Sequence, residues 1–149
     1  MIISDTREQT NSHILKYFEK HGIEYEVRKV DTGDYMNTDN PTTRVERKKN
    51  LQELAHNLLS PDRARFYREV RRARADGIRL VILCEERGVS GLEDVRSWVP
   101  KYGRVSGKAL ADAIFKLYVA YQVPVLYCDK RSTGRRIVEL LTERVECEE

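Results

Sequence analysis

Two short clusters of charged residues in the first third of the chain have the composition of a site that hydrolyses phosphodiesters. The first is the triplet Gly-Asp-Tyr at 33–35, and the second is the triplet Glu-Arg-Lys at 46–48. In such sites one or two protein carboxylates hold a divalent cation, and waters and phosphate oxygens complete its shell. Asp34 and Glu46 would supply those carboxylates, and the cation would lower the pKa of the attacking water. Lys48 would orient that water or stabilise the developing charge.

Neighbouring strands must position these side chains. Residues 35–37 and 44–48 have the patterns of two strands, and the turn-forming segment between them predicts a hairpin. Successive side chains of a strand point to opposite faces, so Glu46 and Lys48 share one face while Arg47 points to the other. Each triplet alone also has a structural explanation, because Gly-Asp is a common turn signal and charged triplets are typical of solvated strand edges when 34% of the residues are charged.

The rest of the chain alternates between strand patterns and amphipathic helix patterns. Besides the hairpin, the predicted strands are 2–3, 24–30, 80–84 and 123–128, and the predicted helices are 12–21, 51–59, 62–76, 106–121 and 133–145. The segment 86–107 is predicted to be a loop in which Trp98 covers the core. This order of elements predicts a single α/β domain over residues 1–149. Its expected architecture is a three-layer sandwich with a central mixed β-sheet flanked by helices.

Composition narrows the functional classes. The 149 residues include 27 Lys and Arg against 24 Asp and Glu, a net charge of +3, so nucleic-acid affinity would have to come from local basic patches. No apolar run is long enough to span a membrane and the N-terminus has no secretory pattern, so a cytoplasmic protein is expected. The isolated Cys84, Cys128 and Cys147 and the three histidines lack the spacing of a metal site.

Three motifs together resemble a known family. The segment Asp-Thr-Arg-Glu at 5–8, the triplet at 33–35 and the triplet at 46–48 resemble the nuclease domain of the XPF/Hef-type structure-specific endonucleases, whose signature is GDY followed by ERK. The resemblance spans about residues 2–129. It implies a restriction-endonuclease-like fold, dependence on Mg²⁺ or Mn²⁺, and cleavage of branched, flapped or single-stranded DNA.

The resemblance also implies roles for the acidic residues and the lysine. Asp34 and Glu46 become the metal ligands, and Lys48 becomes the residue that acts on the nucleophilic water. Asp5 and Glu8 match the upstream acidic positions of the family. Both are expected to complete the catalytic site, either directly or through water.

Basic residues are expected to contact nucleic acid. Arg7, Arg47 and Arg65 match basic positions of the family, where they either hold backbone phosphates or fix the carboxylates. Arg65, Arg68 and Arg72 form a row at i, i+3 and i+7 of the predicted helix 62–76, and such a row can follow a phosphate backbone. The competing interpretation is a solvated helix face balanced by the acidic residues of the same segment.

Two departures from the family concern substrate choice and activity. Gln52 stands where the family usually has an acidic residue, with Glu53 beside it. The 149 residues are also expected to hold the nuclease domain alone, without a helix-hairpin-helix or helicase module. A homodimer or a DNA-binding partner protein would then supply substrate choice. The apolar residues expected to divide between the core and a partner surface are Leu117, Tyr118, Tyr121, Leu140 and Leu141.

The leading functional prediction is therefore a metal-dependent DNA endonuclease that uses a metal-activated water. The main alternative is a non-catalytic DNA-binding or scaffolding module that retains the nuclease fold. Gln52 slightly favours that alternative, whereas the paired carboxylates and the lysine argue against it. A third class, a sugar- or nucleotide-binding α/β domain, lacks support because the chain has no Gly-rich phosphate loop.

Overall fold

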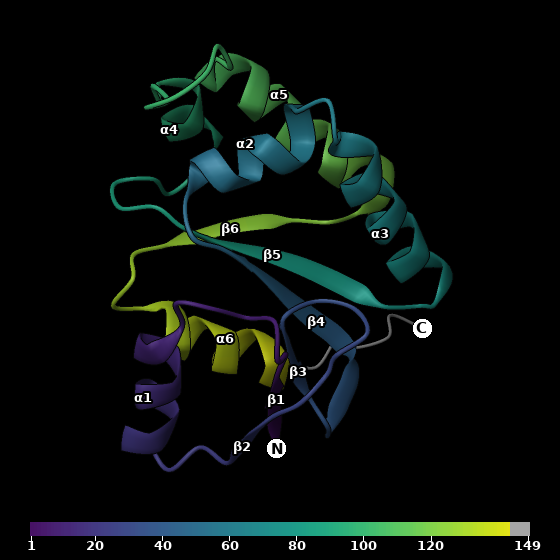
Figure 1. Ribbon diagram of the computed structural model, residues 1–149, viewed down its shortest axis with the longest axis vertical. Helices are drawn as coiled ribbons and strands as arrows, with labels where there is room; N and C mark the ends of the chain where they lie inside the picture. Colours follow the sequence, from purple (N-terminus) through teal and green to yellow (C-terminus); the bar gives the residue numbers. More distant parts are fainter. Residues whose placement is uncertain (144–149) are drawn as a thin grey trace.

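The computed structural model describes residues 1–143 and contains one mixed β-sheet of six strands (Figure 1). The strands are β1 (Ile2–Ser4), β2 (Tyr25–Val27), β3 (Tyr35–Asn37), β4 (Asn40–Lys48), β5 (Arg79–Glu85) and β6 (Val125–Cys128), in the spatial order β2-β1-β3-β4-β5-β6. Strand β3 is antiparallel to both β1 and β4, whereas β4, β5 and β6 are parallel. The mixed sheet predicted from the sequence is confirmed.

Helices cover both faces of this sheet (Figure 1). The helices α1 (Ser12–Lys20) and α6 (Thr133–Thr142) lie on one face, and α2 (Leu51–Leu59), α3 (Arg63–Ala75), α4 (Leu92–Arg96) and α5 (Gly107–Tyr121) lie on the other. The predicted three-layer arrangement is therefore confirmed. Within residues 1–143, no helix has both the length and the apolar character needed to cross a membrane. The expected cytoplasmic location stays a prediction.

Strand β5, which lies between β4 and the edge strand β6, divides the hydrophobic core in two. Leu80 and Ile82 pack in the cluster beneath α2, α3 and α5, and Val81 and Leu83 pack in the cluster beneath α1 and α6. Successive side chains of a strand point to opposite faces, so a continuous apolar run supplies both clusters at once. The run predicted as a doubly buried strand therefore lies inside the sheet, between β4 and β6, with helices over both of its faces.

The hairpin between β3 and β4 is tighter than predicted. Strand β4 begins at Asn40, not at Arg44, and the sheet pairing shifts register next to Asn37. The side-chain Oδ1 of Asn37 accepts a hydrogen bond from the backbone N–H of Asp39 at 3.0 Å, which stabilises a short turn. Pro41 lies in the irregular part of the strand, where its missing N–H is tolerated.

Other boundaries also differ from the predicted ones. The predicted loop 86–107 contains the short helix α4. This helix has five residues, which is too few to show a helical periodicity in the sequence. Trp98 packs against the larger core cluster, which confirms its predicted position over the core. Strand β2 is shorter than predicted. The predicted end of the last helix at residue 145 and Cys147 lie outside the described residues.

Candidate active site

Backbone hydrogen bonds hold the first charged triplet against the second. Asp34 donates its backbone N–H to the carbonyl of Val45 at 2.8 Å, and its carboxylate Oδ2 accepts the N–H of Arg47 at 2.7 Å. The preceding Gly33 has a φ of +79°, and a Cβ there would lie 2.9 Å from Cβ of Arg44. Glycine therefore satisfies both the backbone conformation and the close approach of the two strands. The Gly-Asp pair sets where the Asp34 carboxylate points.

The carboxylates predicted to bind metal line one cavity. Asp34 and Glu46 lie on its wall together with Asp5, and its volume is about 240 Å³. Glu69 of α3 lines the same cavity and was not assigned to the site from the sequence. The only local signal for Glu69 was its place one turn after Arg65 on the predicted basic helix.

Burial and mutual repulsion make these carboxylates hard to ionise. Burial raises the pKa of Asp34 well above its usual range, and the nearby charges of Glu46 and Glu8 raise it further. Burial also raises the pKa of Glu46, against the opposing effect of Lys48, whose Nζ lies 3.4 Å from Glu46 Oε1. A bound cation would stabilise the ionised forms of both carboxylates.

The donor set fits a hard divalent cation. In the part of the chain that the structure describes, no three Asp, Glu, His or Cys side chains converge as a ready ligand group. Asp34 and Glu46 would therefore be the direct protein ligands, and waters would complete the shell, as Mg²⁺ commonly requires. Glu8 Oε2 is buried without a hydrogen-bond partner among the described residues, but Glu8 is not one of the residues that line this cavity, and its catalytic role stays a prediction.

Asp5 is oriented by two hydrogen bonds. Its Oδ1 accepts the backbone N–H of Val30 at 2.9 Å, and its Oδ2 accepts Arg7 Nε at 2.8 Å. Both oxygens of this buried carboxylate therefore have protein partners. In this geometry Asp5 braces the wall of the cavity rather than facing a cation with a free oxygen, and its catalytic role stays a prediction.

Lys48 lies at the boundary of the carboxylate cavity. It shares a strand face with Glu46, as the alternation predicts, and its ammonium lies 5.4 Å above the ring of Phe66. The side chain is 7% exposed. A cation over an aromatic face is attracted to the ring, so Phe66 and Glu46 together fix where the ammonium lies.

Arg47 faces the interior, and its predicted contact with nucleic acid stays a prediction. Its guanidinium is 1% exposed; Nε pairs with Glu85 Oε1 at 2.6 Å, and Nη1 pairs with Glu8 Oε1 at 3.3 Å. Two backbone carbonyls, those of Gln9 and Thr10, accept its remaining hydrogen bonds. Of the two roles that the sequence left open, fixing the carboxylates is the one that this geometry supports.

Glu85, at the end of β5, is a second residue that the sequence did not single out. Its Oε1 lies 2.6 Å from Nε of Arg47 and 2.9 Å from Nε2 of His13. Burial alone would raise the pKa of Glu85, but the hydrogen bonds from these two partners outweigh burial and lower it. Glu85 thus stays ionised and anchors the arginine of the second triplet.

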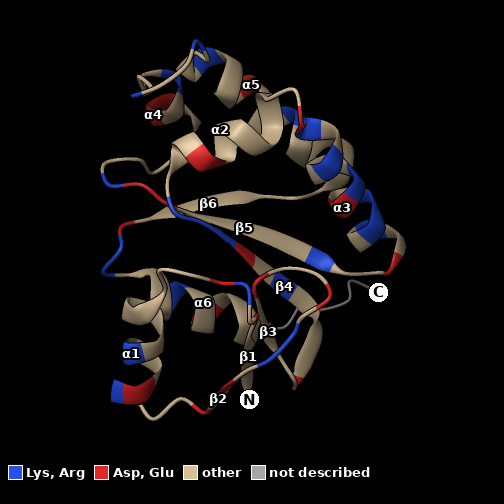
Figure 2. Cartoon of the chain, in the orientation of Figure 1, with Lys and Arg blue, Asp and Glu red and all other residues tan. Residues whose placement is uncertain are grey.

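The other predicted DNA-contacting arginines lie at the surface around the cavities. Arg7 is 68% exposed, and Arg72 donates Nη2 to the carbonyl of Asp31 at 3.3 Å; both residues line the carboxylate cavity. Arg65 and Arg68 are exposed on the arginine-rich helix α3 (Figure 2). The structure leaves all four available to a ligand, and their contact with DNA stays a prediction.

Gln52 and Glu53, which mark the departure from the family pattern, do not line the carboxylate cavity. Gln52 donates Nε2 to the carbonyl of Tyr102 at 3.3 Å. Asn50 caps the start of α2, because its Oδ1 accepts the N–H of Glu53 at 2.8 Å, and Glu53 Oε2 accepts the N–H of Lys49, the residue before the cap, at 3.2 Å. This cap fixes how the chain leaves β4 just after Lys48.

The raised pKa of Asp34 predicts a stability that depends on pH. The unfolded Asp pKa is about 3.9, so the folded state binds this proton more tightly than the unfolded chain does. The contribution of Asp34 to stability is therefore greatest below about pH 3.9 and falls as pH rises through the raised folded-state pKa. Asp34→Asn keeps an acceptor for the Arg47 N–H and removes the charge. We expect it to raise the melting temperature in EDTA at pH 7 by about 4 °C, or roughly 1–2 kcal/mol.

Calorimetric melts across pH 4 to 8 would measure the difference in melting temperature between Asp34→Asn and the parent. This difference should shrink toward acid pH, where the Asp34 carboxyl of the parent is protonated and therefore also uncharged. The exposed Asp112 does not line the carboxylate cavity, so Asp112→Asn provides the control variant. A melting temperature of Asp34→Asn at or below that of the parent at pH 7 would contradict the prediction.

A mixed six-stranded sheet that presents two carboxylates and a lysine from one hairpin defines the class of this protein as an α/β domain of nuclease type. The chain belongs to the ERCC4 domain family, whose model matches residues 4–140. Two solved structures of XPF from Aeropyrum pernix are similar, one with a TM-score of 0.69 and another, a complex with DNA, with 0.70. Each is 22% identical to this chain, and each match covers 94% of this chain and 62% of the XPF chain.

These similarities confirm the family and the fold expected from the three motifs. The chain spans less than two thirds of the length of the XPF structures that it matches. No curated protein matches the chain.

Proposed function

We propose that this protein is a DNA endonuclease that depends on Mg²⁺ or Mn²⁺ and cleaves phosphodiester bonds in branched, flapped or single-stranded DNA. The observation that carries this proposal is the convergence of Asp34 and Glu46, both with raised pKa values, on one cavity beside Lys48. Membership of the ERCC4 domain family and the DNA complex of the similar XPF structure support it.

The residues around the carboxylate cavity divide the chemical work. Asp34 and Glu46 would hold the cation, which when bound would supply an activated water and polarise the phosphoryl oxygen. Lys48 neutralises charge that develops on the phosphate and helps to orient the water. Glu8 accepts a hydrogen bond from a water through its unpartnered Oε2. Arg47 acts indirectly, because it fixes Glu8 and donates its backbone N–H to Asp34.

Basic side chains next to the cavity position the DNA. Arg7 and Arg72 stand on the cavity wall, and Arg65 and Arg68 continue the positive surface along α3 (Figure 2). Contacts from such side chains to phosphates release counterions, so binding should weaken steeply as salt rises. These contacts set where the backbone lies and carry no sequence preference.

A cleavage assay tests the proposal. Purified protein is incubated with labelled fork, flap, single-stranded and linear duplex DNA, in Mg²⁺, in Mn²⁺ and in EDTA. We expect cleavage of at least one of the first three substrates, only with metal. The non-catalytic DNA-binding or scaffolding module predicts salt-sensitive binding to the same DNA and no cleavage with either metal, together with no heat of divalent-metal binding in calorimetry.

A homodimer would complete this function by adding a second DNA-contacting surface. Three of the five apolar residues considered from the sequence, Leu117, Leu140 and Leu141, belong to the core. Tyr121 is half-buried, with its ring 6.1 Å from that of Tyr67. The fifth residue, Tyr118, is exposed, and with Phe115 and Val119 it forms the exposed apolar surface of α5, beside the edge strand β6.

A second copy of this chain is the partner that we propose for that surface. Sedimentation is expected to show a dimer that Phe115→Glu converts to a monomer, because a charge is costly to bury in an apolar interface. Phe115 is 57% exposed in the single chain, so the variant should fold normally. A parent protein that sediments as a strict monomer at micromolar concentration would remove the homodimer and leave a DNA-binding partner protein as the source of substrate choice.

A further inference from the structure

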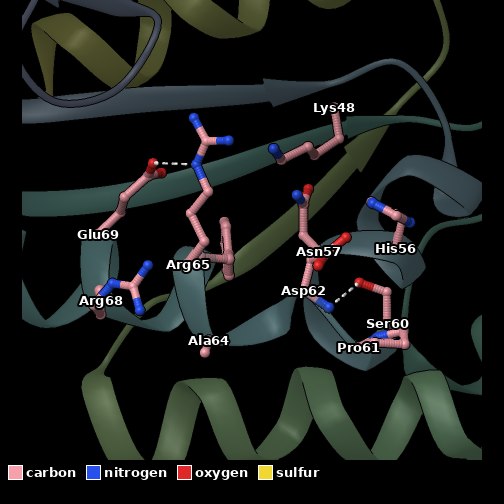
Figure 3. A pocket seen from close by; sticks show the side chains of 11 residues that line it. Lys48, His56, Asn57, Ser60, Pro61, Asp62, Ala64, Arg65, Arg68 and Glu69 are labelled. Atoms are coloured by element: carbon pink, nitrogen blue, oxygen red, sulfur yellow. Dashed lines mark hydrogen bonds and ion pairs between the residues drawn. The ribbon is translucent and has the colours of Figure 1, made fainter.

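A second cavity adjoins the carboxylate cavity and has the opposite charge character. It lies between the end of α2 and the first turns of α3, with Lys48 of β4 on the wall across from these helices, and its volume is about 810 Å³ (Figure 3). Phe66 and Glu69 line both cavities, so they form the partition between them. Whatever occupies the α2–α3 cavity is therefore an immediate neighbour of the proposed metal site.

Cationic side chains dominate the α2–α3 cavity. Lys48, Arg65 and Arg68 line it, whereas Asp62 and Glu69 are its acidic residues. The carboxylate of Glu69 lies 4.0 Å from Arg65, and that of Glu46 lies 3.4 Å from Lys48. Arg68 is the cation of this cavity that forms no ion pair among the described residues. Figure 3 shows Lys48 and Arg65 directed toward the same space. An anionic ligand is favoured here, in contrast to the cation favoured behind the partition.

The α2–α3 cavity also holds a polar atom that lacks a partner. The amide oxygen of Asn57 is buried and accepts no hydrogen bond among the described residues, and Figure 3 places this amide beside Lys48. A buried acceptor without a donor costs stability. Side-chain amides provide a donor and an acceptor side by side, which matches the edge of a nucleobase. The His56 ring on the same wall adds an aromatic surface of the kind on which bases stack.

We propose that the α2–α3 cavity binds one unpaired nucleotide next to the scissile phosphate. The volume falls in the range of roughly 300–1,000 Å³ typical of small-ligand sites. Lys48, Arg65 and Arg68 contact its phosphate groups, and Asn57 bonds its base. A nucleotide within a duplex has its base edge occupied by its partner strand, so it cannot make the Asn57 contact. This inference rests on the proposed endonuclease function and gives that function a preference for unpaired DNA within the nuclease domain itself.

Metal-free binding tests the α2–α3 site without requiring catalysis. Fluorescence anisotropy in EDTA compares a labelled single-stranded oligonucleotide with a blunt duplex. Arg68→Ala and Arg71→Ala each remove one exposed charge from α3, but only Arg68 lines the cavity. We expect Arg68→Ala and Asn57→Leu to raise the Kd for single strands about fivefold, and Arg71→Ala to have a smaller effect. On the duplex, the two arginine variants should be equal.

Cleavage provides a second, independent readout. Once the cut position is mapped in Mn²⁺, the nucleotide on each side of it is replaced in turn by an abasic sugar. At one of these positions the loss of the base should lower kcat/KM of the parent about tenfold. Asn57→Leu should have the same kcat/KM on this abasic substrate as on the intact one. Because Asn57→Leu removes an unpartnered polar atom, its thermal melt should match or exceed that of the parent.

Two results would overturn the inference. One is an equal loss of single-strand binding in Arg68→Ala and Arg71→Ala with no change in Asn57→Leu. The other is an abasic effect of the same size in Asn57→Leu and in the parent. A parent protein that cuts no substrate contradicts the endonuclease function instead, and the metal-free binding comparison then decides the nucleotide site by itself.

Discussion

Asp34→Asn and Glu46→Gln are each expected to lower the rate of DNA cleavage by at least about a thousandfold, the effect of losing metal-dependent stabilisation of the transition state. Both substitutions preserve size and keep one acceptor oxygen, but they replace the other oxygen by an NH2 donor and remove the charge that would hold the cation. Both carboxylates line the same cavity. Each would supply a separate ligand to the cation, so neither can replace the other. The measurement is the single-turnover rate on the best substrate found for the parent, at saturating Mg²⁺ and Mn²⁺.

The control for these variants is Asp112→Asn, which removes one carboxylate from the exposed face of α5. It should cleave at the parental rate. Calorimetric titration with Mn²⁺ adds a readout that does not depend on turnover, and we expect the heat of binding to disappear in Asp34→Asn and in Glu46→Gln. Cleavage by either variant within tenfold of the parent would contradict the assignment of these residues as metal ligands.

Arg47→Ala is expected to cause the largest loss of stability, about 3–5 kcal/mol of the free energy of unfolding, because it leaves buried charges without a partner. Glu8 and Glu85 are each 6% exposed at the side chain, and both pair with this guanidinium. For a chain of this size the melting temperature should fall by about 10 °C. Urea unfolding followed by circular dichroism would measure the change in free energy.

Two comparisons separate the buried network from a general effect of losing an arginine. Arg7→Ala removes a guanidinium that is 68% exposed, and its cost should stay below about 1 kcal/mol. Neutralising Glu8 and Glu85 as Gln in the Arg47→Met background should recover much of the lost stability, since no unpaired charge then remains buried. An Arg47→Ala protein as stable as Arg7→Ala would refute the structural role of Arg47.

Within this network Glu85 gives a pH dependence opposite in sign to that of Asp34. The folded-state pKa of Glu85 is lowered, so its contribution to stability is present above the unfolded Glu pKa of about 4.3 and is lost as pH falls through the folded-state value. Arg47→Ala removes the pairing that sustains this contribution. The gap in stability between this variant and the parent should therefore narrow toward acid pH.

The sequence by itself determined the fold class and most elements of the site. Period-two alternation put Glu46 and Lys48 on one strand face, and the apolar run of β5 put that strand inside the sheet with both faces covered by helices. These features depend on neighbours along the chain, because the geometry of a strand or a helix is set locally. The three motifs at residues 5–8, 33–35 and 46–48 were also enough to identify the family, which the match of the ERCC4 domain model confirms.

Only the tertiary structure decided what each charged side chain faces. Arg47 is of a residue type that commonly contacts DNA. In the structure it lies in the interior, where its guanidinium pairs with Glu85, 38 residues further along the chain. Phe66 separates an acidic cavity from a basic one, although it reads in the sequence only as an apolar helix position. Partners brought together by sheet order and helix packing leave no periodic signal in the chain. For that reason the carboxylate pair was predictable from the sequence, whereas the network that holds it and the cavity beside it were not.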